Sequence, residues 1–283
     1  PTVVKADGLA SGKGVYICKS NNEAKNAVSE IFDGKFGKAD CVLVEEFLNG
    51  EEMSYFIISD GKEYKSFQTA QDHKRVGEGD TGPNTGGMGS YSPSRLSNKN
   101  LEAKINKKII EPTLAGLKKL NTEYVGFLYV GLMISNNEPY LIEFNVRMGD
   151  PECQTILPLL KSDLGEIILS CCNQSLSSQK IEWLYKKSLC IVLCSNGYPG
   201  EYKKKVIIKN TDNLNLQEGQ YLIHAGTKYI DKDLYSYGGR VLNIVVTSNT
   251  FENSRKKALE ILDKINWKNG FYRKDIGYNV INT

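Results

Sequence analysis

The stretch that decides the fold spans residues 140–152 and reads YLIEFNVRMGDPE. Its first half alternates apolar and polar residues, which predicts a β-strand over 140–146. Because side chains alternate across a strand, Glu143, Asn145 and Arg147 share one face. A carboxylate and an amide oxygen are hard ligands that suit Mg²⁺, which keeps its other positions for water and phosphate oxygens. Arg147 beside them can stabilise charge on a phosphoryl group during transfer.

The opposite face of this strand carries Ile142, Phe144 and Val146. We expect these apolar residues to supply the inner face of the strand. The alternative interpretation is that the polar residues are only the solvated side of a surface strand. A turn follows at 149–152, where Asp150 is free to act as a hydrogen-bond acceptor.

A glycine-rich loop follows the first predicted strand, residues 2–5. Its glycines are Gly8, Gly12 and Gly14. Glycine lets backbone N–H groups approach phosphate oxygens, and Lys5 and Lys13 add positive charge. The spacing fits neither GxxxxGK[ST] nor GxGxxG. An ordinary hairpin turn therefore remains the alternative.

A segment rich in glutamate connects two predicted strands at residues 44–52. The first strand ends in Glu45 and Glu46, and the second resumes after Gly50. A chain that crosses between two lobes can offer its backbone to the edge of an adenine, and Glu52 can accept hydrogen bonds from ribose hydroxyls. The alternative is a solvated strand end.

Composition excludes several classes of protein. The 283 residues carry a formal charge of +3, which does not point to nucleic acid. The longest uninterrupted apolar run, 189–194, is too short to cross a bilayer. The seven cysteines show no CxxC spacing, so we expect reduced thiols rather than disulfides or zinc.

The pattern of elements predicts three units. Residues 1–59 read as a small α/β unit, 60–186 as a second unit and 187–283 as short strands with one helix. In the second unit we expect one strand at 64–71, a long polar loop at 72–89 and a helix capped by Ser162. A chain that opens on a strand feeding a glycine-rich loop also suggests a longer polypeptide.

Several segments together resemble the phosphoribosylamine–glycine ligase family. The matching segments run in order along the chain, at residues 4–15, 71–75, 80–89, 91–93, 147–154, 224–228, 238–241 and 273–277. The resemblance implies an α+β fold of the ATP-grasp type, in which two α+β lobes clamp ATP, followed by a small β-rich C-terminal domain. Residues 1–59 would then be an incomplete first lobe, and 60–186 the second lobe with the metal and substrate site.

The resemblance also implies a set of site residues. ATP as co-substrate would be bound by Lys5, Gly12, Lys13, Glu45, Glu46, Leu48 and Glu52. The metal, Mg²⁺ or Mn²⁺, would be held by Glu143 and Asn145. The substrates would be bound by Asp72, Lys74, Thr85, Gly86, Gly87, Lys228 and Arg240. The catalytic residues would be Arg147 and Asp150.

The implied reaction joins glycine to 5-phosphoribosylamine through a glycyl phosphate, with ATP as phosphoryl donor, in de novo purine biosynthesis. We expect a cytoplasmic monomer whose partners are these small molecules, with no nucleic acid and no membrane. The family's upstream domain is missing from the sequence, Met148 replaces a usual Phe, and Gly131 lies where other ATP-grasp enzymes place a further metal carboxylate. Two other functions stay open: a different ATP-grasp carboxylate–amine ligase, and a non-catalytic nucleotide-binding fragment.

Overall fold

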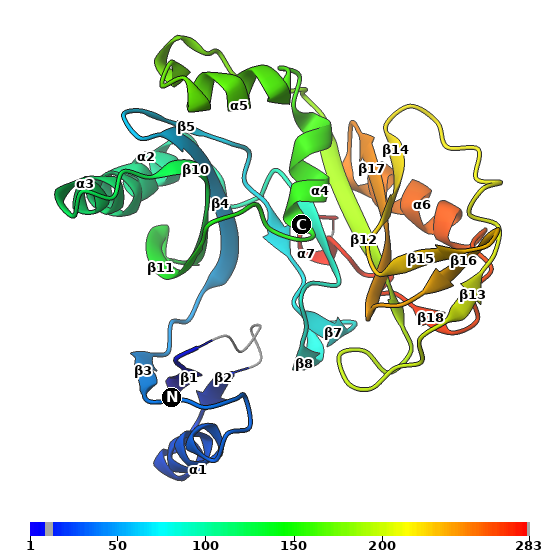
Figure 1. The fold of residues 1–283 in the computed structure, drawn as a ribbon, viewed down its shortest axis with the longest axis horizontal. Helices are drawn as coiled ribbons and strands as arrows, with labels where there is room; N and C mark the ends of the chain where they lie inside the picture. The colour runs from blue at the N-terminus through cyan, green and yellow to red at the C-terminus, as the bar shows by residue number, and fades with distance from the viewer. Residues whose placement is uncertain (9–13, 282–283) are drawn as a thin grey trace.

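The N-terminal part is a small sheet with a helix on one face (Figure 1). The computed structural model describes residues 1–8 and 14–281. The elements of this part are β1 (Thr2–Ala6), β2 (Val15–Cys18), α1 (Asn21–Phe32) and β3 (Val42–Glu46). The strands are antiparallel in the order β2-β1-β3. α1 buries Ala27 and Ile31 against Val4 and Cys18 on one side of the sheet.

A second sheet, in the order β11-β10-β4-β5, is built from strands between residues 51 and 145. Its strands are β4 (Glu51–Asp60), β5 (Tyr64–Ser66), β10 (Val125–Ser135) and β11 (Glu138–Asn145). The helices that cover it are α2 (Lys99–Ile105), α3 (Glu111–Lys119), α4 (Glu152–Ile156) and α5 (Leu164–Cys172). The α2 side buries Met53, Tyr55 and Ile57, whereas the side of α4 and α5 buries Phe56 and Ile58. β4 is therefore apolar on both faces because helices cover both.

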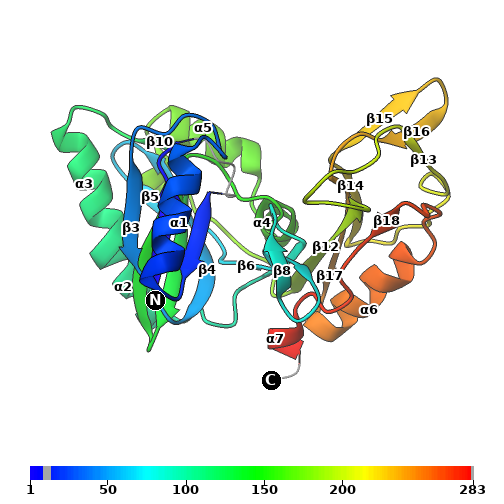
Figure 2. The ribbon, with the colours of Figure 1, turned by 90° about the horizontal axis from the view of Figure 1, so that it is seen from below.

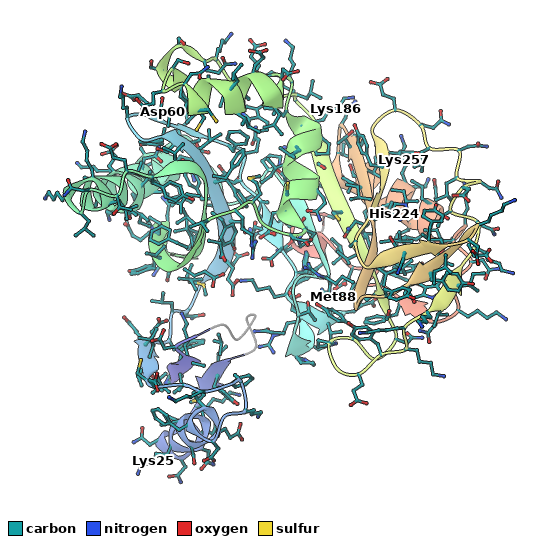
Figure 3. The ribbon with its side chains drawn as sticks, in the orientation of Figure 1. Lys25, Asp60, Met88, Lys186, His224 and Lys257 are labelled. Atoms are coloured by element: carbon teal, nitrogen blue, oxygen red, sulfur yellow. The ribbon has the colours of Figure 1, made fainter. Side chains whose placement is uncertain are left out.

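A third sheet, in the order β14-β17-β12-β9-β6, joins distant parts of the chain. Its strands are β6 (Gln71–Asp72), β9 (Gly89–Ser92), β12 (Lys187–Ser195), β14 (Gln220–His224) and β17 (Arg240–Ser248). Met88, labelled in Figure 3, is fully buried in the same core as Leu189 and Val245. Residues on both sides of position 187 thus share one hydrogen-bonded layer, and the three-unit division remains a prediction.

The other elements lie around this third sheet (Figure 2). They are β7 (Arg75–Gly77), β8 (Thr81–Asn84), β13 (Val206–Ile208), β15 (Thr227–Ile230), β16 (Asp233–Ser236), α6 (Phe251–Leu262), β18 (Gly270–Phe271) and α7 (Tyr278–Ile281). α6 packs on the sheet through Ala258, Ile261 and Leu262. No helix in residues 1–8 and 14–281 is long and apolar enough to cross a membrane.

Three local predictions were wrong. The single strand expected at 64–71 is two short strands, β5 and β6, in different sheets. The long loop expected at 72–89 contains the β7–β8 hairpin and ends in β9. α5 is capped by Asp163, whose side chain accepts from the Glu166 N–H at 3.0 Å, and not by Ser162. The hairpin was missed because its strands are short and rich in glycine.

The apolar face of β11 also differs from expectation. Ile142 is half-buried, Phe144 is 37% exposed and Val146 is 77% exposed. β11 is an edge strand, and the described residues do not cover this face. The predicted inner face is therefore largely open.

Candidate functional site

Lys5 and Glu45 lie on the face of the first sheet that α1 leaves open. Across the two ladders, Lys5 is paired with Val15 and Leu43. Val3, which lies on the same face of β1, is paired with Ile17 and Glu45. The Lys5 Nζ atom lies 2.5 Å from Glu45 Oε2. The apolar neighbours are 40–50% exposed: Val15 40%, Ile17 50% and Leu43 49%. This face therefore offers a flat apolar surface beside one cation and one carboxylate.

The other predicted adenine contacts lie at the end of β3. Glu46 points away from the Lys5 face because it alternates with Glu45 along the strand. In the described residues β3 pairs only with β1, so its outer backbone edge is open to hydrogen bonds. Leu48 follows in the crossing to β4. Gly12 and Lys13 lie outside the described residues, and their roles stay predictions.

Glu143 and Asn145 converge at the end of β11. Asn145 Nδ2 lies 3.4 Å from Glu143 Oε1. Glu143 is paired across the ladder with Gly131, and a Cβ at Gly131 would lie 3.1 Å from Glu143 Cγ. Within the described chain, no group of three His, Cys, Asp or Glu side chains could hold a metal. The pair fits a hard cation that takes its remaining ligands from water and phosphate.

Asp150 is held in place by Arg240, which reaches it from the C-terminal part of the chain. Arg240 Nη2 lies 3.2 Å from Asp150 Oδ2, and Arg240 Nη1 donates to the Asp150 carbonyl at 2.8 Å. The same Nη1 donates to the Gly86 carbonyl at 2.6 Å. Arg147, which follows β11, donates to the Met148 carbonyl at 2.9 Å and is otherwise exposed. The structure thus brings together the predicted residues Gly86, Asp150 and Arg240.

Two further residues of this group were missed by the sequence analysis. Gln154 Nε2 donates to Asp150 Oδ1 at 2.8 Å, while the buried Gln154 Oε1 has no partner among the described residues. The hydroxyl of Tyr198 accepts from the Gly86 N–H at 2.9 Å. Gln154 lies inside the resembling segment 147–154, so position within that segment could have indicated it. Tyr198 belongs to the turn NGYPG at 196–200, which carries no signal beyond its turn composition.

Thr85 and Gly87 are placed by close backbone packing. Thr85 Oγ1 accepts from the Gly87 N–H at 3.0 Å and donates to the Lys74 carbonyl at 2.9 Å. Gly87 has a φ of +112°, and a Cβ there would lie 2.5 Å from Pro151 Cδ. Only glycine lets the loop lie this close to the residue after Asp150.

Glu52, Asp72, Lys74 and Glu152 form a group that we call the charged cluster. The Lys74 ammonium is ion-paired with Glu52, and Gln71 Nε2 donates to the Glu52 carbonyl oxygen at 3.0 Å. Glu152 is only 4% exposed and accepts from Ser54 Oγ at 2.9 Å. Glu152 was not predicted as a site residue, although it is the last residue of the stretch 140–152 that contains the predicted metal pair.

The carboxylates of this cluster outnumber its single cation, Lys74. Burial raises the pKa of Asp72 to about 7, Lys74 opposes that rise, and Glu152 and Glu52 add to it. Burial alone would lower the pKa of Lys74, but Asp72 and Glu52 outweigh burial and hold it well above its usual range. Burial also raises the pKa of Glu152. Such a cluster suits a substrate that brings a second positive charge.

Lys228 is not brought to the other predicted site residues. It lies on β15, and its Nζ atom lies 5.6 Å from the centroid of the Tyr237 ring. Among the described residues, no hydrogen bond or ion pair joins it to Asp150, Arg240 or Lys74. Its role toward a ribose phosphate stays a prediction.

Comparisons with known proteins show the family of the chain. Residues 1–153 match the family model "Phosphoribosylglycinamide synthetase, ATP-grasp (A) domain", and residues 188–279 match "Phosphoribosylglycinamide synthetase, C domain". The chain is 45% identical over 282 residues to the phosphoribosylamine–glycine ligase of Brucella melitensis, covering 99% of this chain and 66% of that protein. The Agrobacterium fabrum protein of the same name is 46% identical, with the same two coverages.

A solved structure gives the same result. The crystal structure of phosphoribosylamine–glycine ligase from Thermotoga maritima aligns with a TM-score of 0.88 at 35% identity, over 98% of this chain and 68% of that one. The match of residues 1–153 to the ATP-grasp (A) domain model therefore defines an ATP-grasp protein. The chain belongs to the phosphoribosylglycinamide synthetase family. It spans about two thirds of the length of the two bacterial relatives it matches.

Proposed function

We propose that this chain forms the ATP-binding and ligating part of an enzyme that joins glycine to 5-phosphoribosylamine, giving glycinamide ribonucleotide, ADP and phosphate. The observation that carries the proposal is the bridge made by Arg240. It links Asp150, five residues beyond Asn145, to Gly86 in the loop between β8 and β9. This bridge supports the proposal because it joins two candidate substrate residues, Gly86 and Arg240, to the candidate catalytic residue Asp150.

The first step of the proposed reaction activates glycine. A glycine carboxylate oxygen attacks the γ-phosphorus of ATP, the bond to the β-phosphate oxygen breaks, and ADP leaves with that electron pair. Lys5 and Arg147 offset the negative charge of the phosphates during this transfer. Glu143 and Asn145 would hold Mg²⁺ or Mn²⁺, which supplies further charge neutralisation when bound.

The second step forms the amide. The amine of 5-phosphoribosylamine attacks the carbonyl carbon of glycyl phosphate, phosphate leaves with the electron pair of the C–O bond, and the amine loses a proton. Asp150, fixed by Arg240 and Gln154, orients that amine. The Asp72 and Glu152 carboxylates bind the ammonium of glycine beside Lys74, whose own charge stays paired with Glu52.

The pKa of Asp72 leads to a testable pH dependence. With ATP and 5-phosphoribosylamine saturating, kcat/KM for glycine should fall about tenfold per pH unit below pH 7, because protonated Asp72 no longer attracts the ammonium. Bound glycine favours the ionised carboxylate, so the corresponding fall in kcat should lie at lower pH. Asp72→Asn should lose this acid limb. A limb that persists unchanged in the variant would assign it to another group.

The test of the function is substrate-dependent release of ADP by the full-length protein. We expect ADP only when glycine and 5-phosphoribosylamine are both present, with glycinamide ribonucleotide formed in equal amount. Alanine in place of glycine and ribose 5-phosphate in place of the amine are the controls. Release that requires a different acid or amine would assign the chain to another ATP-grasp ligase. Location in the cytoplasm and the monomeric state stay predictions.

A further inference from the structure

His73 is a buried titratable residue that the proposed reaction does not use. Its side chain is 2% exposed, and both ring nitrogens have protein partners. Nε2 accepts the Gly277 N–H at 3.0 Å, and Nδ1 lies 3.4 Å from Asp80 Oδ1. Because Nε2 accepts, the ring proton belongs on Nδ1, where it is donated to Asp80.

The partners of His73 belong to a network around residues 273–278, which we call the C-terminal clamp. Arg273 is 1% exposed and donates to Asp80 Oδ1 at 2.6 Å and to the Arg75 carbonyl at 3.0 Å. Asp275 accepts from Arg273 Nε at 2.8 Å. Tyr278 donates to Asp80 Oδ2 at 2.9 Å. The clamp thus contacts the β7–β8 hairpin through the buried guanidinium of Arg273.

The carboxylate of Asp80 is charged in this network. Burial alone would raise its pKa, but hydrogen bonds from His73 and Arg273 outweigh burial and hold the pKa well below its usual range. An ionised acceptor strengthens each of these hydrogen bonds. The hydrogen bond from His73 to Asp80 is therefore made to a charged carboxylate.

The backbone of His73 links this clamp to the charged cluster. The His73 N–H donates to the Gly89 carbonyl and its carbonyl accepts from Met88, both at 2.8 Å. Neighbouring side chains in an extended segment point to opposite sides. The His73 side chain faces the clamp, whereas Asp72 and Lys74 face the charged cluster.

We propose that His73 is a positioning residue that fixes the backbone carrying Asp72, which binds the ammonium of glycine, and Lys74, which lies beside it. The imidazole ties the backbone between these two residues to the C-terminal clamp, so the pair meets the substrate in one arrangement. This inference rests on the proposed function and adds to it a role for the last part of the chain.

Three substitutions separate the two hydrogen bonds of the ring. His73→Leu removes both of them. His73→Gln offers an amide oxygen near the Nε2 position and keeps the Gly277 contact. His73→Asn offers an amide N–H near the Nδ1 position and keeps the Asp80 contact. The matched control is Tyr272→Phe, which removes one hydrogen bond from the neighbouring segment, to Asp263 rather than to the clamp.

The readout is the split between KM and kcat in the full-length protein. We expect His73→Leu to raise KM for glycine about tenfold, with KM for ATP within about twofold of wild type. The Gln and Asn variants should fall between wild type and Leu, and Tyr272→Phe should match wild type. A residue needed only for folding would lower the apparent kcat through the fraction of folded protein and leave KM unchanged.

Two results would overturn the inference. If all three His73 variants keep the wild-type KM for glycine while ADP release is normal, His73 has no positioning role and the proposed function stands. If the wild type releases no ADP with glycine, both proposals fall together. Should His73→Leu not fold, the Gln and Asn variants carry the same comparison.

Discussion

Glu143→Gln is expected to lower kcat of the proposed ligation by about 10³-fold, with ATP still bound. The substitution keeps the size of the side chain and removes its charge. Asn145 is neutral, so Glu143 supplies the only formal negative charge of the predicted metal pair. Gly131, opposite Glu143 in the ladder, has no side chain that could replace it.

The measurement is the dependence of ADP formation on Mg²⁺ concentration, together with direct titration of the metal into nucleotide-loaded protein. The variant should need far more Mg²⁺ and show weaker metal binding. Glu123→Gln, an exposed acid ahead of β10, is the matched control and should behave as wild type. Equal Mg²⁺ requirements for Glu143→Gln and wild type would show that Glu143 is not a metal ligand.

Arg273→Met is expected to destabilise the protein by about 3 kcal/mol. The methionine fills part of the space but leaves Asp80 and Asp275 without their shared cation. We place the effect at the low end of the range for broken buried pairs because the Asp80 side chain is 39% exposed and water screens it. The effect should appear as a lower urea midpoint.

The cause can be checked by removing the charges that Arg273 leaves behind. The triple variant Arg273→Met, Asp80→Asn, Asp275→Asn should recover part of the lost stability, since no unpaired carboxylate remains. Arg255→Met, at a partly exposed position on α6, is the control for loss of an arginine. A triple variant less stable than Arg273→Met would mean that the two carboxylates make other contacts of greater value.

Much of the fold could be predicted because its strands and helices are locally encoded. The strands around 2–5, 15–18 and 189–194 follow from runs of β-branched and apolar residues, and they were found within one or two residues. The split of 64–71 between two sheets was missed because the choice of partner strand depends on contacts far away in the sequence. β6 pairs with β9, and β9 with β12, and no local pattern announces either pairing.

The residues of the candidate site also divide into those that local sequence predicts and those that depend on distant contacts. Glu143 and Asn145 were predicted as neighbours because two-residue spacing on a strand places them together. The bond between Asp150 and Arg240 joins residues 90 positions apart, and only the resemblance had placed Arg240 at the site. Glu152 and Tyr198 were missed since their roles come from burial and long-range contact, which composition does not encode.

The position of β9 in the third sheet has a consequence for synthesis of the protein. β9 pairs with β12, whose residues leave the ribosome about 100 positions later. At roughly 5–20 residues per second, β9 waits on the order of 5–20 s for this neighbour. During that interval Met88 and Tyr91, both fully buried in the finished molecule, have no core to enter. The nascent chain therefore passes through a stage in which chaperone binding and slowed translation should decide the yield of native protein.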